Sequence, residues 1–225
     1  DSFSCRLGKG THKALNRFRS LAYEVSQNHT RTCWILKCDI RKFFARIDQT
    51  ILLPILRERI TDQDTLWLLE QVIYSFHSTR PRIGLPLGNL TSQLLVNIYL
   101  NEFDQFVKHE LKQKHYLRYA DDFAILSPVR DCLLRLIPPV NNFLSSKLKL
   151  TLHSQKVSIN TLASGVDFLG WVHFSDHRVL RITTKKRMFR RLDGASRNQE
   201  VTQSYLGLLR HGNTHKLRSK IKSLL

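Results

Sequence analysis

Three aspartates in this 225-residue chain are placed so that they could act together: Asp39, and the adjacent pair Asp121 and Asp122. Asp39 ends an apolar run at residues 33–39, which predicts a buried strand with the carboxylate at its edge. The pair interrupts an apolar run at residues 116–126, which predicts two strands joined by an Asp-Asp turn. Carboxylate oxygens are the ligands that Mg²⁺ prefers. The set is therefore suited to nucleotidyl transfer, which uses two divalent ions about 3.5–4 Å apart.

A solvated Asp-Asp turn is the ordinary alternative for such a pair. Neighbouring side chains on an extended strand point to opposite faces of the sheet. Only a tight turn would let Asp121 face the metal ions while Asp122 lies nearby at the rim. The choice between the two interpretations therefore depends on the flanking residues.

The composition favours a polyanionic partner. Lys and Arg number 36 against 18 Asp and Glu, so the net charge is +18 and the pI is about 10.2. Charge alone leaves both nucleic acid and an anionic membrane surface open. Apolar runs such as residues 51–56 are far shorter than the roughly 20 residues of a membrane span, and no signal peptide is visible. We expect a soluble, intracellular protein. Four cysteines without a CxxC pair argue against a disulfide framework and a zinc site.

Helices and strands must hold these carboxylates in place. Apolar spacing predicts a helix at residues 11–27, with Thr11 as a possible cap, and a long helix after Asn89. That long helix carries Leu95, Ile98, Tyr99, Phe103 and Phe106 on one face. Further helices are predicted at about 50–60, 63–77 and up to 147, and strands at 166–174 and 178–182. Residues 178–225 form a helix-like basic tail with a net charge of +11.

The flanking residues resemble the reverse transcriptases. Tyr-Ala-Asp-Asp-Phe at 119–123 resembles their YxDD box, and residues 38–44 resemble the motif of their first catalytic aspartate. Three further segments match in the family's order, and the resemblance covers nearly the whole chain. They are the nucleotide-binding loop at 84–93, the lysine motif at 152–156 and the primer grip at 166–171. The resemblance implies an RNA-directed DNA polymerase.

It also implies a role for particular residues. Asp39 and Asp121 would bind two Mg²⁺ ions, with Asp122 as third carboxylate and the backbone carbonyl of Ile40 as a minor ligand. Deoxynucleoside triphosphates would be bound by residues of three motifs: Arg41, Lys42, Phe43, Phe44, Leu87, Gly88, Gln93 and Lys156. The primer grip would comprise Phe168, Leu169, Gly170 and Trp171.

Two of these roles have plain alternatives. Phe44, five residues after the first aspartate, would pack under the sugar and exclude a 2′-hydroxyl, but a core phenylalanine fits the sequence equally well. Lys156 could protonate or neutralise the pyrophosphate leaving group, or be a solvated surface lysine.

The implied fold is α+β, a right-hand polymerase with an antiparallel palm sheet backed by helices. We expect remaining fingers at residues 1–32, a palm at 33–182 with finger-derived helices at about 50–80, and a basic helical thumb at 183–225. The chain starts at Asp1 without Met, and the family normally has a fingers segment before this point. We therefore expect a fragment of a longer protein.

Three segments resemble the reverse transcriptases of diversity-generating retroelements more narrowly: Leu87-Gly88 followed by Ser92-Gln93, residues 5–12, and residues 204–213. That resemblance implies error-prone copying of a template RNA into cDNA at adenines, binding of the primer–template duplex, a small basic accessory protein, and a cytoplasmic prokaryotic or phage-encoded enzyme. A conventional group II intron or retron-type reverse transcriptase, and a truncated, inactive RNA-binding module, stay open as alternatives.

Overall fold

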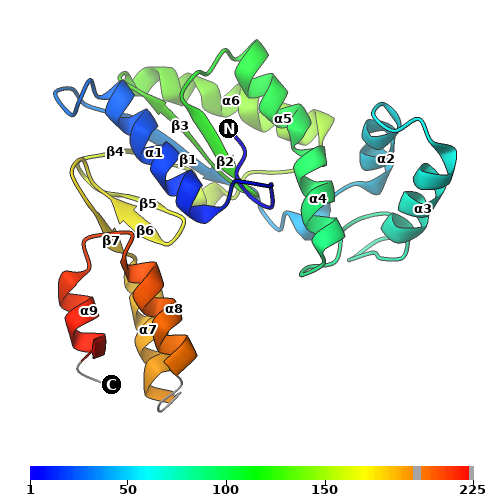
Figure 1. The fold of residues 1–225 in the computed structure, drawn as a ribbon. Coiled ribbons are helices and arrows are strands. Elements are labelled where there is room, and N and C mark those ends of the chain that lie inside the picture. The colour runs from blue at the N-terminus through cyan, green and yellow to red at the C-terminus, as the bar shows by residue number, and fades with distance from the viewer. Residues whose placement is uncertain (195–198, 223–225) are drawn as a thin grey trace.

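The computed structural model describes residues 1–194 and 199–222, and in this part of the chain helices surround two antiparallel sheets (Figure 1). The helices are α1 (Thr11–Val25), α2 (Gln49–Arg57), α3 (Gln63–Tyr74), α4 (Leu90–Tyr99), α5 (Asn101–Gln105), α6 (Arg130–Lys147), α7 (Ile182–Gly194), α8 (Gln199–Leu209) and α9 (His215–Lys222). The strands are β1 (Trp34–Asp39), β2 (Tyr116–Tyr119), β3 (Asp122–Ser127), β4 (Ser158–Thr161), β5 (Val166–Phe168), β6 (Trp171–His173) and β7 (Arg178–Leu180). Within the described residues, no helix is both long and apolar enough to cross a membrane.

The larger sheet has the strand order β2-β3-β1-β4, and every neighbouring pair is antiparallel. Because side chains alternate along a strand, β1 sends Leu36 and Cys38 to one face and Ile35 to the other. The first face packs against α4, α5 and α6, and the second packs against α1. Figure 1 shows α1 and α6 on opposite sides of this sheet. The two cores fix the register of β1 and so the position of Asp39 at its end.

The smaller sheet, in the order β5-β6-β7, joins the larger sheet to the C-terminal helices. Its residues Trp171 and Leu180 form a third core with Leu15 of α1 and with apolar residues of the last three helices. These residues are Met188, Leu209 and Ile221. The described part of the basic tail is therefore mainly helical, as predicted, after its first residues have formed β7. Residues 195–198 and 223–225 of that tail lie outside the described part of the chain.

The structure corrects the start of the first helix. Gly10 occupies the N-cap position of α1 and makes no side-chain cap hydrogen bond, so Thr11 is the first helical residue and not the cap. The hydroxyl of Thr11 instead hydrogen-bonds with the hydroxyl of Tyr119, at 2.9 Å. A threonine at a helix start can serve either role, and the nearby strand β2 supplies the competing partner.

The single long helix predicted after Asn89 is also wrong. The helical path is interrupted at Leu100, between α4 and α5, and widens into a π-helical segment at Phe106–Glu110. Leu95, Tyr99 and Phe103 are nevertheless buried, and Ile98 and Phe106 pack partly buried against the same core. The predicted apolar face is therefore present, and packing against the core changes the local helix geometry without exposing it.

One predicted strand and one predicted turn differ as well. The apolar run at 166–174 is two strands, because Leu169 and Gly170 adopt positive φ and reverse the chain. The hairpin of the aspartate pair turns at Ala120 and Asp121, and Asp122 already belongs to β3. Strand β4 was not predicted, because it is a short and largely polar edge strand.

Candidate active site

Asp39 and Asp122 lie directly opposite each other, as Cα partners in the antiparallel pair β1 and β3. Residues that face each other across a pair of strands project to the same side of the sheet, so both carboxylates are on the face that carries α1. The N–H of Ile40 donates to the carbonyl of Asp121, with a distance of 3.2 Å. Asp39 and the pair Asp121 and Asp122, about 80 residues apart in the chain, are therefore brought to one end of the sheet.

Arg118 supports the turn that presents Asp121. Its side chain is 1% exposed, and its Nη1 donates to the carbonyl of Ala120 at 3.0 Å. Ala120 has a φ of +52°, in the left-handed region that non-glycine residues rarely occupy. Nε and Nη2 of Arg118 donate to the two carboxylate oxygens of Asp104 on α5, at 2.8 and 2.6 Å. This bidentate pair fixes the guanidinium, which in turn holds the turn.

The hydroxyl of Tyr116 completes this buried network by donating to Asp104, at 2.6 Å. Asn97 of α4 extends it: its side-chain oxygen lies 3.3 Å from Nη1 of Arg118, and its amide nitrogen donates to the carbonyl of Ser4. The turn is thus connected to α4, α5 and the N-terminal segment.

Negative charge is concentrated at the turn. Burial is the largest cause that raises the pKa of Asp121, and with the repulsion from the carboxylates of Asp39 and Asp122 the pKa reaches about 6. Burial is also the largest cause that raises the pKa of Asp122. Carboxylates that repel one another in a partly buried site favour a bound cation.

Two lysines partly offset this charge. Nζ of Lys156 donates to Oδ2 of Asp39 at 2.9 Å, and that hydrogen bond raises the pKa of the lysine. Lys156 arrives there because its segment lies along the end of β1, where the N–H of His153 donates to the carbonyl of Asp39. Lys37, two residues before Asp39 on the same strand, lies 3.8 Å from Oδ1 of Asp122.

The donor set fits hard divalent cations. All three side chains offer oxygen ligands, and Oδ1 of Asp122 is buried without a hydrogen-bond partner among the described residues. In the part of the chain that the structure describes, no three His, Cys, Asp or Glu side chains already surround a single point as a metal cage would. The carboxylate of Asp39 instead binds Lys156. A bound cation would therefore replace a lysine contact.

Two of the three segments predicted to bind nucleotide, residues 41–44 and the loop at 84–93, are adjacent. The N–H of Leu85 donates to the carbonyl of Phe44 at 2.8 Å, and the N–H of Gly84 donates to the carbonyl of Ile47. Phe44 is half-buried and its ring lies 5.5 Å from that of Phe43, which is buried in the core. The loop thus starts beside Phe44, the aromatic residue that follows Asp39 by five positions.

The remaining predicted nucleotide contacts differ in exposure. Arg41, Lys42 and Gly88 are exposed, and Leu87 is 78% exposed. Gly88 has a φ of +91° and open space around its Cα, so this residue leaves room for a close approach of the backbone. The side chain of Gln93 accepts a hydrogen bond from Sγ of Cys5, which ties the loop helix α4 to the N-terminal segment.

The predicted primer grip divides into core and surface. Phe168 and Trp171 are buried and pack in two different cores, so their rings hold the hairpin in place. The turn residues Leu169 and Gly170 instead line an open groove of about 610 Å³, together with Tyr119 of β2. From α7 and the residue before it the same groove receives a set of polar and basic residues: Arg181, Thr183, Thr184, Arg187 and Arg190.

Sequence reasoning missed Arg118, Asp104 and Lys37. Arg118 directly precedes the Tyr-Ala-Asp-Asp segment, and the period of two along a strand places Lys37 on the face of Asp39, so both carried a local signal. Asp104 carried none, because its partner lies on another element.

Comparisons with known proteins agree with this geometry. The family model described as reverse transcriptase (RNA-dependent DNA polymerase) matches residues 1–173. The group II intron-encoded protein LtrA of Lactococcus lactis subsp. cremoris is 25% identical over 228 residues, covering 68% of this chain and 36% of LtrA. The retron Ec83 reverse transcriptase of Escherichia coli is 29% identical over 111 residues, covering 47% of this chain and 36% of the retron enzyme.

An apo telomerase from Candida tropicalis, truncated at its C-terminal domain, has a similar fold, with a TM-score of 0.61 at 13% identity, covering 80% of this chain and 41% of the telomerase. This similarity confirms the predicted α+β, right-hand polymerase fold with antiparallel sheets. The chain spans only about a third of the length of the two curated relatives. Since the family model covers most of the described residues, the chain belongs to the reverse transcriptase family.

Proposed function

We propose that the protein is an RNA-directed DNA polymerase that copies a template RNA into cDNA. The observation that carries this proposal is the cross-strand pair Asp39 and Asp122 with Asp121 in the adjoining turn. Family membership supports the reaction, and the concentration of negative charge at the turn supports binding of divalent cations.

Asp39 and Asp121 would hold two Mg²⁺ ions, with Asp122 and the carbonyl of Ile40 as further oxygen ligands. When bound, such ions lower the pKa of an attacking hydroxyl and stabilise a leaving pyrophosphate. Lys156 lies at the same carboxylates, so its ammonium group is placed to neutralise or protonate that leaving group. The segment that continues from Asp39, with Arg41, and the loop at Gly88 would receive the deoxynucleoside triphosphate.

The open groove would receive the primer–template duplex. Its Arg187 and Arg190 can contact phosphates from α7, and its Tyr119 is the cross-strand partner of Asp122, which connects the groove to the carboxylates. Contacts to phosphates are independent of sequence and weaken steeply with salt. On this basis we assign residues 183–225 to a thumb, 33–182 to a palm with finger-derived helices at about 50–80, and 1–32 to the remaining fingers.

We further propose that this polymerase belongs to the diversity-generating type and copies adenines with low fidelity. Leu87 supports this proposal, because it is an exposed apolar side chain next to Gly88 and cannot form the hydrogen bonds that a glutamine would. A small basic accessory protein would then be a partner. The similarity to LtrA and to the retron enzyme is equally consistent with a conventional group II intron or retron-type reverse transcriptase, which is the second candidate.

Primer extension on an RNA template with Mg²⁺ tests the proposal. We expect the wild-type protein to extend the primer and Asp121→Asn to bind the same primer–template without extending it. Binding without extension by the wild-type protein would instead favour the inactive RNA-binding module.

A further inference from the structure

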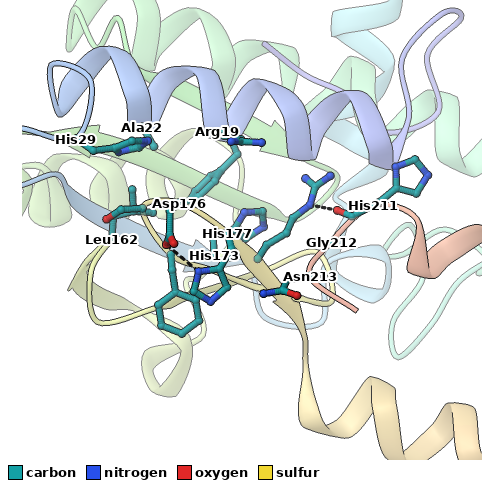
Figure 2. Close-up of a pocket in the computed structure, with 14 residues that line it drawn as sticks. Arg19, Ala22, His29, Leu162, His173, Asp176, His177, His211, Gly212 and Asn213 are labelled. Carbon is teal, nitrogen blue, oxygen red and sulfur yellow. Dashed lines mark hydrogen bonds and ion pairs between the residues drawn. The ribbon is translucent and has the colours of Figure 1, made fainter. Parts of the chain in front are cut away.

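A second cavity, of about 200 Å³, lies between α1, the turn that joins β6 to β7, and the loop that joins α8 to α9. Figure 2 shows Arg19 on α1, His177 on the β6–β7 turn and Asn213 on the α8–α9 loop around this space, while the ring of His211 points away from it. None of its lining residues lines the open groove of the proposed polymerase site. The cavity is therefore a separate feature of the surface.

Two arginines give this cavity a positive charge. Arg19 and Arg178 both line it, and among the described residues neither forms an ion pair with a carboxylate. Nε of Arg178 donates to the carbonyl of His211, while its Nη1 hydrogen-bonds to no described residue. Burial lowers the pKa of Arg178, and the charge of Arg19 lowers it further. Two neighbouring guanidinium groups without a counter-charge favour an anion.

The acidic residue in the lining does not supply that counter-charge. Asp176 has a side chain that is 84% exposed, and its carboxylate pairs with Nδ1 of His177 at 2.7 Å. Among the groups that carry a full charge, the cavity is thus predominantly cationic, which excludes a cationic ligand and favours a phosphate.

Flat rings form the rest of the walls. The ring of Phe174 stacks on that of His177 at 4.9 Å, and the ring of Phe18 lies 4.7 Å from that of the buried His173. The volume exceeds what a phosphate group alone needs. Aromatic faces beside guanidinium groups are the combination with which proteins hold unstacked nucleotides of single-stranded RNA.

We propose that this cavity binds a nucleotide of single-stranded RNA, with its phosphate at Arg19 and Arg178 and its base or ribose against the ring of Phe174. RNA would then contact the protein outside the groove that holds the primer–template duplex. The cavity contains none of the carboxylates of the proposed polymerase, so RNA binding there does not depend on catalysis.

Photo-crosslinking of a short single-stranded RNA that contains 4-thiouridine tests this assignment. The full chain and three variants are compared: Arg19→Ala, Lys13→Ala and Asp121→Asn. Arg19 and Lys13 are both exposed cations of α1, but only Arg19 lines the cavity, so the pair is matched for lost charge. We expect crosslinks to the peptide that contains Phe174, a several-fold loss of them in Arg19→Ala, and wild-type yields in Lys13→Ala and Asp121→Asn.

The salt dependence of binding gives a second readout. Arg19→Ala should reduce the slope of log affinity against log salt by about 0.7, as expected for one lost phosphate contact on a single strand. Crosslinks confined to the groove peptides, or equal losses in Arg19→Ala and Lys13→Ala, would overturn the proposal. If adenosine monophosphate displaced the RNA at equal molar concentration, the cavity would bind a free nucleotide and not a nucleotide within an RNA strand, which would overturn the proposal. Because Asp121→Asn is expected to crosslink like the wild type, a lack of RNA binding at the cavity can be distinguished from a lack of the proposed polymerase activity.

Discussion

Nη1 of Arg118 donates to the backbone carbonyl of Ala120, 3.0 Å away, and so connects a buried ion pair to the turn that presents Asp121. Ala120 has a left-handed backbone conformation, which is unfavourable for alanine because its side chain cannot form a local hydrogen bond that would stabilise it. The turn therefore depends on support from outside, and Arg118 supplies it while Asp104 holds the guanidinium in place.

Arg118→Lys should keep the charge beside Asp104 but lose the fork that also reaches Ala120. We expect the rate of primer extension to fall roughly 10–100-fold, the range that follows from a small misplacement of reacting groups. More Mg²⁺ should be needed for half-maximal rate, and the melting temperature should fall as well, because Arg118 is buried and its fork of hydrogen bonds is lost. Arg17→Lys is the control, since the side chain of Arg17 also pairs with an aspartate, Asp1, but within the described part of the chain it does not hydrogen-bond to the turn. A wild-type rate and Mg²⁺ dependence in Arg118→Lys would contradict this role.

Asp121→Asn should stabilise the protein when Mg²⁺ is chelated. The folded-state pKa of Asp121 is raised to about 6, so the folded protein loses stability as the pH rises from about 4 through 6 and the carboxylate ionises. Because asparagine is uncharged, the free energy of unfolding of the variant should be about 1–3 kcal/mol higher than that of the wild type at neutral pH. Thermal unfolding in EDTA measures it. Mg²⁺ should raise the melting temperature of the wild type and not that of the variant, and a destabilised variant in EDTA would refute the explanation.

His173 should make stability depend on pH in the opposite direction. Burial and the charge of Arg178 lower its pKa to about 4, whereas in the unfolded chain it keeps its ordinary value of 6.5. Between pH 6.5 and about 4, His173 is protonated in the unfolded chain but stays neutral in the folded protein, so the free energy of unfolding falls as the pH drops. The difference in unfolding free energy between pH 7.5 and about pH 4.5 should be about 2–3 kcal/mol larger in the wild type than in His173→Phe. Denaturant unfolding at both pH values gives that difference, and equal pH dependence would exclude this residue as the cause.

Gly212→Ala should loosen the packing of the α8–α9 loop against the smaller sheet. A Cβ at position 212 would overlap Cζ3 of Trp171 and lie 2.9 Å from the carbonyl oxygen of Arg178, so a methyl group has no space there. Overpacking of this kind costs about 1–3 kcal/mol. The control is Gly207→Ala in α8, where a Cβ meets nothing within 4 Å and alanine should be neutral or stabilising. Equal melting temperatures of the two variants would argue against the close contact.

Leu87→Gln should raise the fidelity of copying opposite template adenines. Glutamine adds hydrogen-bonding groups at an exposed position next to Gly88, which would hold the nascent base pair with more directional contacts. Sequencing of cDNA made on an adenine-rich RNA template measures the error rate. We expect the rate of extension to change less than the rate of misincorporation, and an unchanged error rate at adenines would contradict the proposal.

Local patterns in the sequence were enough to find the carboxylates and most of the elements that carry them. The apolar run before Asp39 and the two runs around Asp121 predict strands because alternation and turn residues act within a few positions. The order of the motifs was likewise sufficient to suggest the family to which the chain belongs.

Only the tertiary structure decided which partners these residues meet. Asp39 faces Asp122 because the two cores fix the register of β1 against β3, and Arg118 meets Asp104 because α5 packs behind the hairpin. The cavity at Arg19 requires α1, the β6–β7 turn and the α8–α9 loop together. Side-chain contacts across such separations depend on packing among elements far apart in the chain, and no local pattern of residues encodes them.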